Sequence, residues 1–298
     1  MRIAVTGATG FIGSHVSVKL ARAGHQVVAT GRNPSKLPAL ASIPGIELAR
    51  GDLSDPSTWA SCLEGCDSLV HIGLGWGDTG IDMLHNDTEA SVRLFQAAVD
   101  AGITRIIYTS STAACGEMQA VNREDMLPRP VDFYGATKAA TEAYLRAFGH
   151  KHNLSVHVVR PGYTFGEAIV EGAHGQPDTR FRDICRAVAK GEVVKLVKHD
   201  GTQFLHAQDI AEVYLALLTY KPSPSVHYAL SAQWRSWVEV VKLADEVSGR
   251  TTEIVLEDRG YGETPFVFDV SAIQNDLGLS FGNLDRLREH VRWELSRA

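Results

Sequence analysis

Two side chains four positions apart, Tyr134 and Lys138, form the pair in this sequence best suited to proton transfer. Residues at this spacing on a helix lie on one face, so the phenol and the ammonium are expected to be neighbours. A phenol with a pKa near ~10 is a poor base at neutral pH, and a nearby positive charge lowers that pKa. The pair therefore predicts a tyrosine that exchanges a proton with a substrate oxygen, assisted by Lys138.

Hydroxyl side chains precede this pair at Ser110, Ser111 and Thr112, directly after the apolar run that contains Ile106 and Ile107. Ligands bind at the C-terminal ends of the strands in a parallel sheet, so a hydroxyl at this place can hold a substrate oxygen. Hydroxyls at a strand end also form turns and caps, which is the structural alternative. Together with the Tyr/Lys pair, the run favours a site in which a hydroxyl orients the reacting oxygen.

A glycine turn at Gly7, Gly10 and Gly13 lies behind the apolar run 3–5 and before an amphipathic stretch, 11–23. Glycines at these positions let the chain turn sharply, approach a phosphate closely and press the helix onto the strand. The N-terminus of the helix adds free N–H groups and a partial positive charge. The turn therefore predicts a pyrophosphate site, as in proteins that bind a dinucleotide.

The end of the second expected strand indicates which dinucleotide is preferred. Proteins that bind NAD usually carry an acidic residue there for the ribose 2′-hydroxyl, whereas this chain has Gly31 followed by Arg32. A guanidinium can bind a 2′-phosphate, which favours NADP(H) over NAD(H), although Arg32 can also be a solvated turn residue. Asp52 could accept a hydrogen bond from the adenine or cap the helix near Pro56.

The elements that must position these residues alternate along the first half of the chain. Expected strands and helices follow one another with short connections, which predicts an α/β fold with a doubly wound parallel sheet covered on both faces. We expect residues 1–160 to form the dinucleotide-binding domain and 161–298 a smaller α/β lobe for the substrate, with the strand and helix near 203–219 returning to the first domain. The expected strands are 2–6, 26–30, 45–50, 67–72, 105–110 and 155–160, and the expected helices are 11–23, 56–63, 81–101 and 133–150.

Composition narrows the class of protein. The chain has 298 residues, 44% of them hydrophobic, and a net charge of −6, which argues against nucleic acid as a partner. We expect no membrane span, and because a strand begins at the second residue we expect no signal peptide. The four cysteines, Cys62, Cys66, Cys115 and Cys185, are too few for a disulfide framework, which favours the cytoplasm, and no metal site is expected from their spacing.

Taken together, the motifs resemble those of the extended short-chain dehydrogenase/reductases, in particular of the NAD(P)-dependent epimerase/dehydratase type. The resemblance covers nearly the whole chain and rests on the segments 6–13, 70–72, 110–116, 134–138, 160–166 and 204–209.

The resemblance implies a role for each site residue. It implies a Rossmann fold, Tyr134 as the catalytic acid and base, Lys138 as its partner and, counting back from Gly116, Ser111 as the substrate-binding hydroxyl, with Thr112 as second choice. Asn86 resembles an asparagine found near such active sites. The residues expected to bind the cofactor are Gly7, Thr9, Gly10, Phe11, Ile12, Arg32, Asp52, Leu53, Tyr134, Lys138 and Pro161.

Departures from the family pattern exclude some activities. Dehydratases of this type carry an Asp-Glu pair after the catalytic hydroxyl, whereas Ala113 and Ala114 stand near that place here, so elimination of water is not expected. Nucleotide-sugar enzymes usually carry an arginine before the segment that contains Phe204, and residues 199–203 contain none. Arg180 or Arg182 could replace it, or both are surface charges.

We therefore expect an NAD(P)-dependent oxidoreductase that interconverts a carbonyl and an alcohol on a small polar substrate, such as a sugar, a sugar acid or a hydroxy-ketone. The first alternative is a sugar or nucleotide-sugar epimerase with tightly bound NAD, and the second is a cofactor-binding protein without catalysis. The expected helices 81–101 and 133–150 could pair with those of a second copy, which predicts a homodimer.

Overall fold

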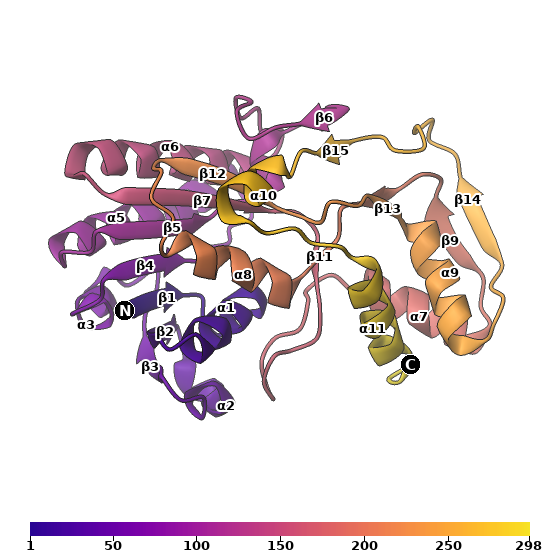
Figure 1. Ribbon diagram of the computed structural model, residues 1–298, viewed down its shortest axis with the longest axis horizontal. Helices are drawn as coiled ribbons and strands as arrows, with labels where there is room; N and C mark the ends of the chain where they lie inside the picture. Colours follow the sequence, from indigo (N-terminus) through magenta and orange to yellow (C-terminus); the bar gives the residue numbers. More distant parts are fainter.

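A seven-stranded parallel sheet forms the centre of the molecule, as the alternation of strands and helices predicts. The computed structural model describes residues 1–298, apart from the side chain of Lys36. The strand order is β12-β7-β5-β4-β1-β2-β3, with every neighbouring pair parallel (Figure 1). The strands of this sheet are β1 (Arg2–Thr6), β2 (Gln26–Gly31), β3 (Ile46–Arg50), β4 (Ser68–His71), β5 (Arg105–Thr109), β7 (Ser155–Pro161) and β12 (Ser225–Ala229).

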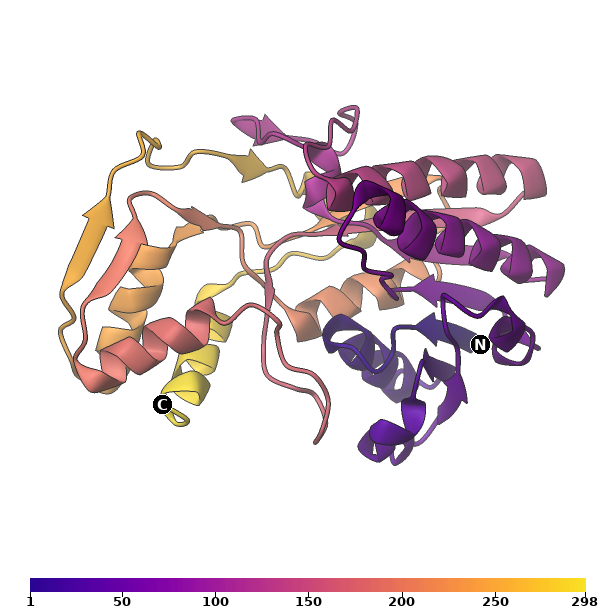
Figure 2. The same cartoon turned by 180° about the vertical axis from the view of Figure 1, so that it is seen from behind.

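Helices cover both faces of the sheet. Alternate residues of each strand point to opposite sides, and both sets are apolar, so each face needs a covering layer. In β1, Ile3 and Val5 pack in the core under α1 and α8, while Ala4 packs in the core under α3, α5 and α6. The two layers are visible from opposite sides in Figures 1 and 2. The helices concerned are α1 (Phe11–Arg22) and α8 (Ala207–Leu217) on one face, and α3 (Trp59–Leu63), α5 (Ala90–Asp100) and α6 (Phe133–His152) on the other.

The predicted helix 81–101 forms with one irregularity. It consists of α4 (Gly80–Met83), a π-helical turn over Leu84–Glu89, and α5. A π-helical turn inserts an extra residue into a helix and changes the direction of the side chains within it, and such turns are frequent at functional sites. Here the turn places Asp87 in the interior, where its side chain is completely buried.

A smaller lobe lies at the C-terminal ends of the strands and has its own core around Phe181, Phe204 and Trp237. Between two passes through this lobe the chain returns to the central sheet, where α8 packs against α1 and β12 adds a strand (Figure 1). Sequence analysis expected both the strand and the helix near 203–219 to return. The helix, α8, does so, but β11 pairs with β8 in a separate two-stranded sheet, and the strand that joins the main sheet is β12, which the sequence did not indicate. The remaining elements are α2 (Pro38–Ala41), β6 (Val121–Asn122), β8 (Thr164–Phe165), α7 (Arg180–Lys190), β9 (Val194–Val197), β10 (Gly201–Thr202), β11 (Leu205–His206), β13 (Arg235–Ser236), α9 (Trp237–Ser248), β14 (Ile254–Glu257), β15 (Val267–Phe268), α10 (Ser271–Leu277) and α11 (Leu284–Leu295).

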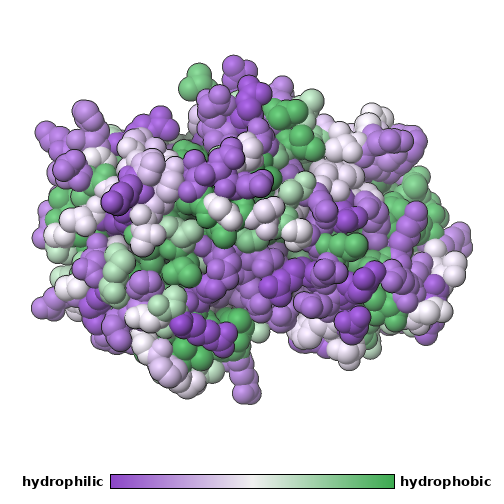
Figure 3. All heavy atoms as spheres, in the orientation of Figure 1, coloured by the Kyte–Doolittle hydropathy of each residue, from purple (hydrophilic) through white to green (hydrophobic). Residues whose placement is uncertain are grey.

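The surface is mostly polar on the side drawn in Figure 3, where hydrophobic residues form small separate groups among hydrophilic ones. Among the described residues, none of the helices has both the length and the apolar character that crossing a lipid bilayer requires.

Candidate active site

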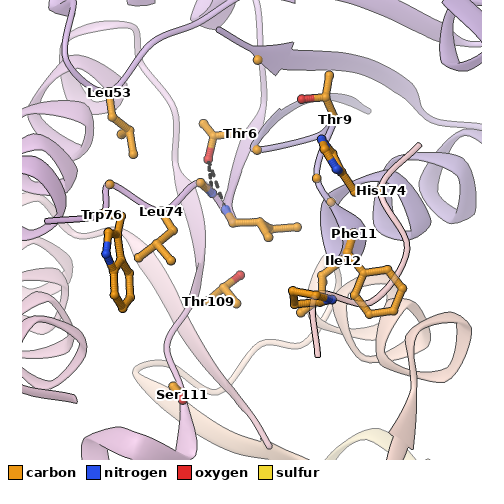
Figure 4. Close-up of a pocket in the computed structure, with 18 of the residues that line it drawn as sticks. Thr6, Thr9, Phe11, Ile12, Leu53, Leu74, Trp76, Thr109, Ser111 and His174 are labelled. Atoms are coloured by element: carbon orange, nitrogen blue, oxygen red, sulfur yellow. Dashed lines mark hydrogen bonds between the residues drawn. The ribbon is translucent and has the colours of Figure 1, made fainter. Parts of the chain in front are cut away.

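A cavity of about 890 Å³ lies at the C-terminal ends of the central strands, where ligands bind in open parallel sheets. It extends from the glycine turn after β1, past the ends of β2, β4 and β5, to the start of α6 and the loop after β7. The first-choice residues that sequence analysis proposed for the cofactor and for catalysis all line this cavity, including Arg32, Tyr134 and Pro161, whereas the second choice, Thr112, is not part of the lining. Figure 4 shows part of this lining, with Ser111 labelled.

The glycine turn has the shape that a closely bound phosphate requires. Gly7 has a positive φ of 65°, and a methyl group there would lie 2.8 Å from the backbone of Gly73. A methyl group at Gly13 would lie 2.1 Å from the Gly7 carbonyl oxygen, so α1 can pack this closely only without a side chain. The turn therefore leaves the N-terminus of α1 open toward the cavity, and these residues fit a dinucleotide pyrophosphate.

The strands that frame the turn are joined by Thr6 and His71. The Thr6 hydroxyl accepts the N–H groups of Ile72 and Gly73, each at 3.1 Å, so its own proton points to His71 Nδ1 at 2.6 Å. Nε2 of His71 then donates to Ser91 at 2.9 Å. Burial lowers the pKa of His71 to about 3, so the ring stays neutral and serves a structural role.

Tyr134 and Lys138 lie on one face of α6, beside the cavity. The Lys138 ammonium is 5.7 Å from the centre of the Tyr134 ring and 5.3 Å from that of Tyr108, which is buried below it. The Ser111 hydroxyl lies next to Tyr134, where its hydrogen bond partly opposes the rise in the pKa of Tyr134 that burial causes. The structure therefore brings together the three side chains that the sequence proposed for catalysis.

The electrostatics of this group differ from the expectation that Lys138 lowers the pKa of the phenol. Burial raises the pKa of Tyr134 above its ordinary value, and the Asp87 carboxylate raises it further. Lys138, only 3% exposed, lies 3.3 Å from Asp87 Oδ2, so much of its positive charge is balanced there. Burial lowers the pKa of Lys138, and the charge of Asp87 opposes that effect.

Asp87 is a member of the site that sequence analysis missed. Its position directly after Asn86, which resembles an asparagine near such active sites, was the feature of the sequence that could have indicated it. The helical pattern alone could not indicate that a π-helical turn directs Asp87 inward. Asn86 itself lines the cavity and donates from Nδ2 to the carbonyl oxygen of Trp76 at 2.8 Å.

A buried ion pair supports the loop that carries Ser111. The Arg160 guanidinium donates to both carboxylate oxygens of Glu142, at 2.9 and 2.7 Å, and Glu142 also accepts the hydroxyl of Ser110. Burial lowers the pKa of Arg160, but the hydrogen bonds and charge of Glu142 outweigh it and raise the pKa above its ordinary value. Ser110 donates its hydroxyl proton to Glu142, whereas the Ser111 oxygen accepts the N–H of Ala113 at 3.1 Å and keeps its own proton available to the cavity. The capping role that hydroxyls at a strand end can have is therefore present at Ser111 beside its place in the cavity.

This ion pair predicts a large loss of stability on mutation. Glu142→Ala leaves the Arg160 charge buried without a partner, and we expect it to lower the free energy of unfolding by about 3–5 kcal/mol. Glu89→Ala, which breaks exposed pairs with His85 and Arg93, serves as the control and should cost about 0.5 kcal/mol or less. Urea denaturation followed by circular dichroism measures both, and equal effects of the two substitutions would contradict a special role for the buried pair.

The structure bears on two roles that the sequence left open, that of Asp52 and that of Arg180. Asp52 lines the cavity and accepts hydrogen bonds from the N–H and hydroxyl of Ser54, while Asp55 caps the turn at Pro56. The capping alternative for Asp52 is therefore wrong. Arg180 pairs with Asp200 at 3.2 Å and lies outside the described lining of the cavity.

A different arginine lies next to the position where the family pattern has one. Arg235 of β13 pairs in register with Thr202 of β10, a neighbour that the linear sequence could not indicate. Its guanidinium is already engaged, since it donates to Gln233, Glu239 and Asn283. The expected departure from the pattern of nucleotide-sugar enzymes therefore remains in the folded chain.

Comparison with known proteins assigns the chain to a family whose expected site residues are those described above. Residues 3–230 match the model of the NAD dependent epimerase/dehydratase family. The chain belongs to this family, which is of the extended short-chain dehydrogenase/reductase type.

Three relatives illustrate the range of proteins to which the chain is similar. A 3 beta-hydroxysteroid dehydrogenase/Delta 5-->4-isomerase of Mycobacterium tuberculosis is 30% identical over 209 residues, which cover 66% of this chain and 54% of that enzyme. The chain thus spans about half the length of this relative. A UDP-glucose 4-epimerase of Azospirillum brasilense is 27% identical over 98% of this chain and 86% of the epimerase. MoeE5, solved in complex with UDP-glucuronic acid and NAD, superimposes with a TM-score of 0.80 at 29% identity, covering 100% of this chain and 99% of MoeE5.

Proposed function

We propose that the protein is a dinucleotide-dependent epimerase that acts on a hydroxyl-bearing ring carbon of a sugar or nucleotide sugar. The observation that carries this proposal is that Ser111, Tyr134 and Lys138 share one cavity with the glycine turn. Sequence analysis put a net oxidoreductase first. Two relatives that match nearly the whole chain, a UDP-glucose 4-epimerase and MoeE5 bound to UDP-glucuronic acid, favour the alternative.

Each residue has a distinct part in this chemistry. The bound nicotinamide supplies the group that accepts and returns hydride. Tyr134 takes the proton from the substrate hydroxyl as the carbonyl forms and gives it back when the alcohol is restored. Ser111 holds the same oxygen by a hydrogen bond and favours the phenolate form of Tyr134, opposing the effect of burial on its pKa. Lys138 lies beside the Tyr134 ring, with much of its charge balanced by Asp87.

A second candidate function is net oxidation or reduction, in which the product leaves in a different redox state. Two observations favour it: the absence of an unengaged arginine near Thr202 among the described side chains, and the similarity to the mycobacterial hydroxysteroid enzyme. Both functions share the same residues and differ only in whether the hydride returns to the substrate.

The two candidates differ in what happens to the cofactor. For the epimerase, purified protein should release about one dinucleotide per chain on denaturation. It should also convert UDP-glucose into an epimer, which proton NMR detects, without a lasting change of absorbance at 340 nm. Continuous consumption of added NADPH or NADH with carbonyl substrates, or of NADP⁺ or NAD⁺ with alcohols, would instead support the net oxidoreductase.

We propose that NADP(H) is the preferred cofactor. Arg32 lines the cavity at the end of β2 and forms no ion pair with the described side chains. Charge-assisted hydrogen bonds to a phosphate contribute about 1.5–3 kcal/mol, so we expect Arg32→Ser to weaken NADPH binding about 10–100-fold. NADH binding should change little. Fluorescence titration measures both, and Arg50→Ser, an exposed arginine outside the cavity lining, is the control. Equal loss of NADH and NADPH affinity would contradict this preference.

We propose a homodimer assembled through α4, the π-helical turn that follows it, and α6. Ile81, Leu84, Phe133 and Tyr144 expose apolar surface on these helices, with Ile81 64% exposed. Burying such surface against a second copy would stabilise the association. Light scattering after size exclusion should give twice the chain mass for the wild type and a monomer for Ile81→Arg, whereas a monomeric wild type would contradict the proposal.

We also propose that the protein works in the cytoplasm on a small polar substrate, with no nucleic-acid partner. All four cysteines are free thiols, and thiols persist in a reducing compartment.

A further inference from the structure

The loop after β4 alternates glycine with large apolar residues, in the order Gly73-Leu74-Gly75-Trp76-Gly77. A methyl group at Gly75 would lie 1.8 Å from the carbonyl oxygen of Asn86, and one at Gly77 would lie 2.4 Å from Asp82 Cβ. These glycines therefore face the α4 helix and its π-helical turn, where no side chain fits. Leu74 and Trp76 project away from that helix, and both line the cavity.

Contacts to the loop backbone hold these two side chains in place. The N–H of Gly75 donates to Asp87 Oδ1 at 3.1 Å, the carbonyl oxygen of Trp76 accepts from Asn86 Nδ2 at 2.8 Å, and the N–H of Gly77 contacts the Met83 sulfur at 3.2 Å. Three consecutive residues are thus attached to one helix. These backbone contacts position the Trp76 indole, although its own side chain is not buried.

The two apolar side chains are largely exposed within the cavity. Trp76 is 63% exposed and Leu74 is 46% exposed. A fixed tryptophan with this much free surface in a cavity is typical of a binding site, since apolar surface gains free energy when a ligand covers it. Figure 4 shows both side chains projecting in the same direction from the loop, toward the end of the cavity that holds Ser111.

The indole also lies next to the proposed proton donor. The centres of the Trp76 and Tyr134 rings are 6.3 Å apart, with 38° between the ring planes. A substrate whose reacting oxygen is bound between Tyr134 and Ser111 therefore has its adjacent atoms within reach of the indole face. Aromatic side chains bind flat apolar groups well because they add a specific contact geometry to the buried area.

We propose that Leu74 and Trp76 form an apolar platform that binds the C–H face of the substrate ring and so positions its hydroxyl-bearing carbon at Tyr134. The ligand class is a cyclic secondary alcohol or ketone with one face of aligned C–H bonds, a property that pyranoses and alicyclic rings share. This inference rests on the proposed function, because it takes the reacting oxygen to lie at Tyr134 and Ser111.

Calorimetry with ring probes tests the platform apart from catalysis. In the Tyr134→Phe background, which stops turnover, UDP-glucose and a 3β-hydroxysteroid are titrated into protein saturated with NADP⁺ or NAD⁺. Adding Trp76→Ala should weaken binding of the preferred probe about tenfold, equivalent to ~1.4 kcal/mol. Trp76→Phe, which keeps an aromatic face, should weaken it less than about threefold. The probe that binds more tightly identifies the ring class.

Two controls separate the platform from other effects. Leu127→Ala removes a leucine that is 79% exposed outside the cavity lining, and it should leave probe binding unchanged. The dinucleotide Kd should be the same with and without Trp76→Ala. Unchanged probe affinity in Trp76→Ala, an equal loss of dinucleotide affinity, or no saturable binding of either ring probe to the parent protein would each overturn the platform. Failure of the proposed function has a different signature, because Tyr134→Phe would then retain turnover.

Discussion

Replacing Tyr134 by phenylalanine is expected to lower kcat about 10²–10⁴-fold, the contribution that a positioned proton-transfer group makes. The change removes one oxygen atom from a ring that is otherwise retained, so the dinucleotide Kd should stay within about threefold of the wild type. Steady-state rates with the substrate identified by the assays above, together with dinucleotide titration, measure the two quantities. The expected loss corresponds to about 3–5 kcal/mol of activation free energy.

Tyr144→Phe provides the matched control for this experiment. Tyr144 is on the same helix, α6, but is exposed and lies outside the cavity lining. It should retain wild-type kcat. A Tyr134→Phe protein that turns over at the wild-type rate would show that the phenol does not exchange the proton, and the catalytic proposal would then have to be abandoned.

Gly13→Ala is expected to affect both folding and cofactor binding. The added methyl group would lie 2.1 Å from the Gly7 carbonyl oxygen and 2.9 Å from Ala8 Cα, and backbone atoms cannot move aside as a flexible side chain can. Relieving the overlap must shift α1 away from the glycine turn. We expect a loss of about 3 kcal/mol in the free energy of unfolding, at the upper end of overpacking effects. Dinucleotide affinity should fall at least about 100-fold.

Thermal denaturation and dinucleotide titration check the two parts of this prediction. Gly282→Ala is the control, because a methyl group there meets no atom within 4 Å and its φ lies outside the left-handed region. It should leave both quantities nearly unchanged. Normal dinucleotide affinity in Gly13→Ala would contradict the role given to the close approach of α1 to the turn.

Sequence patterns were sufficient for features that depend on local chemistry. The glycine spacing at Gly7, Gly10 and Gly13 and the pairing of Tyr134 with Lys138 on one helix face are local, and the structure places these residues around one cavity. The parallel sheet followed from the alternation of elements. The assignment of roles to these residues stays a prediction until the substitutions described above are measured.

Features that depend on contacts between distant segments could not be predicted in this way. Asp87 meets Lys138 because a π-helical turn changes its direction, and this alters the charge beside the phenol. Arg235 reaches the neighbourhood of Thr202 through pairing of two short strands. Trp76 is displayed in the cavity because two glycines are packed against a helix further along the chain. Each case requires knowledge of the tertiary partner.

The return of the chain to the central sheet has a consequence for how the protein can be divided. Strand β12 pairs with β7 although the segment between them contains α7 and the short strands β8 to β11, and α8 packs against α1. No single cut in the chain separates the sheet from the smaller lobe. A fragment ending near residue 160 would expose an unpaired edge at β7 and the bare inner surface of α1, both of which favour aggregation. Interchange of the smaller lobe between relatives would therefore require two or more junctions.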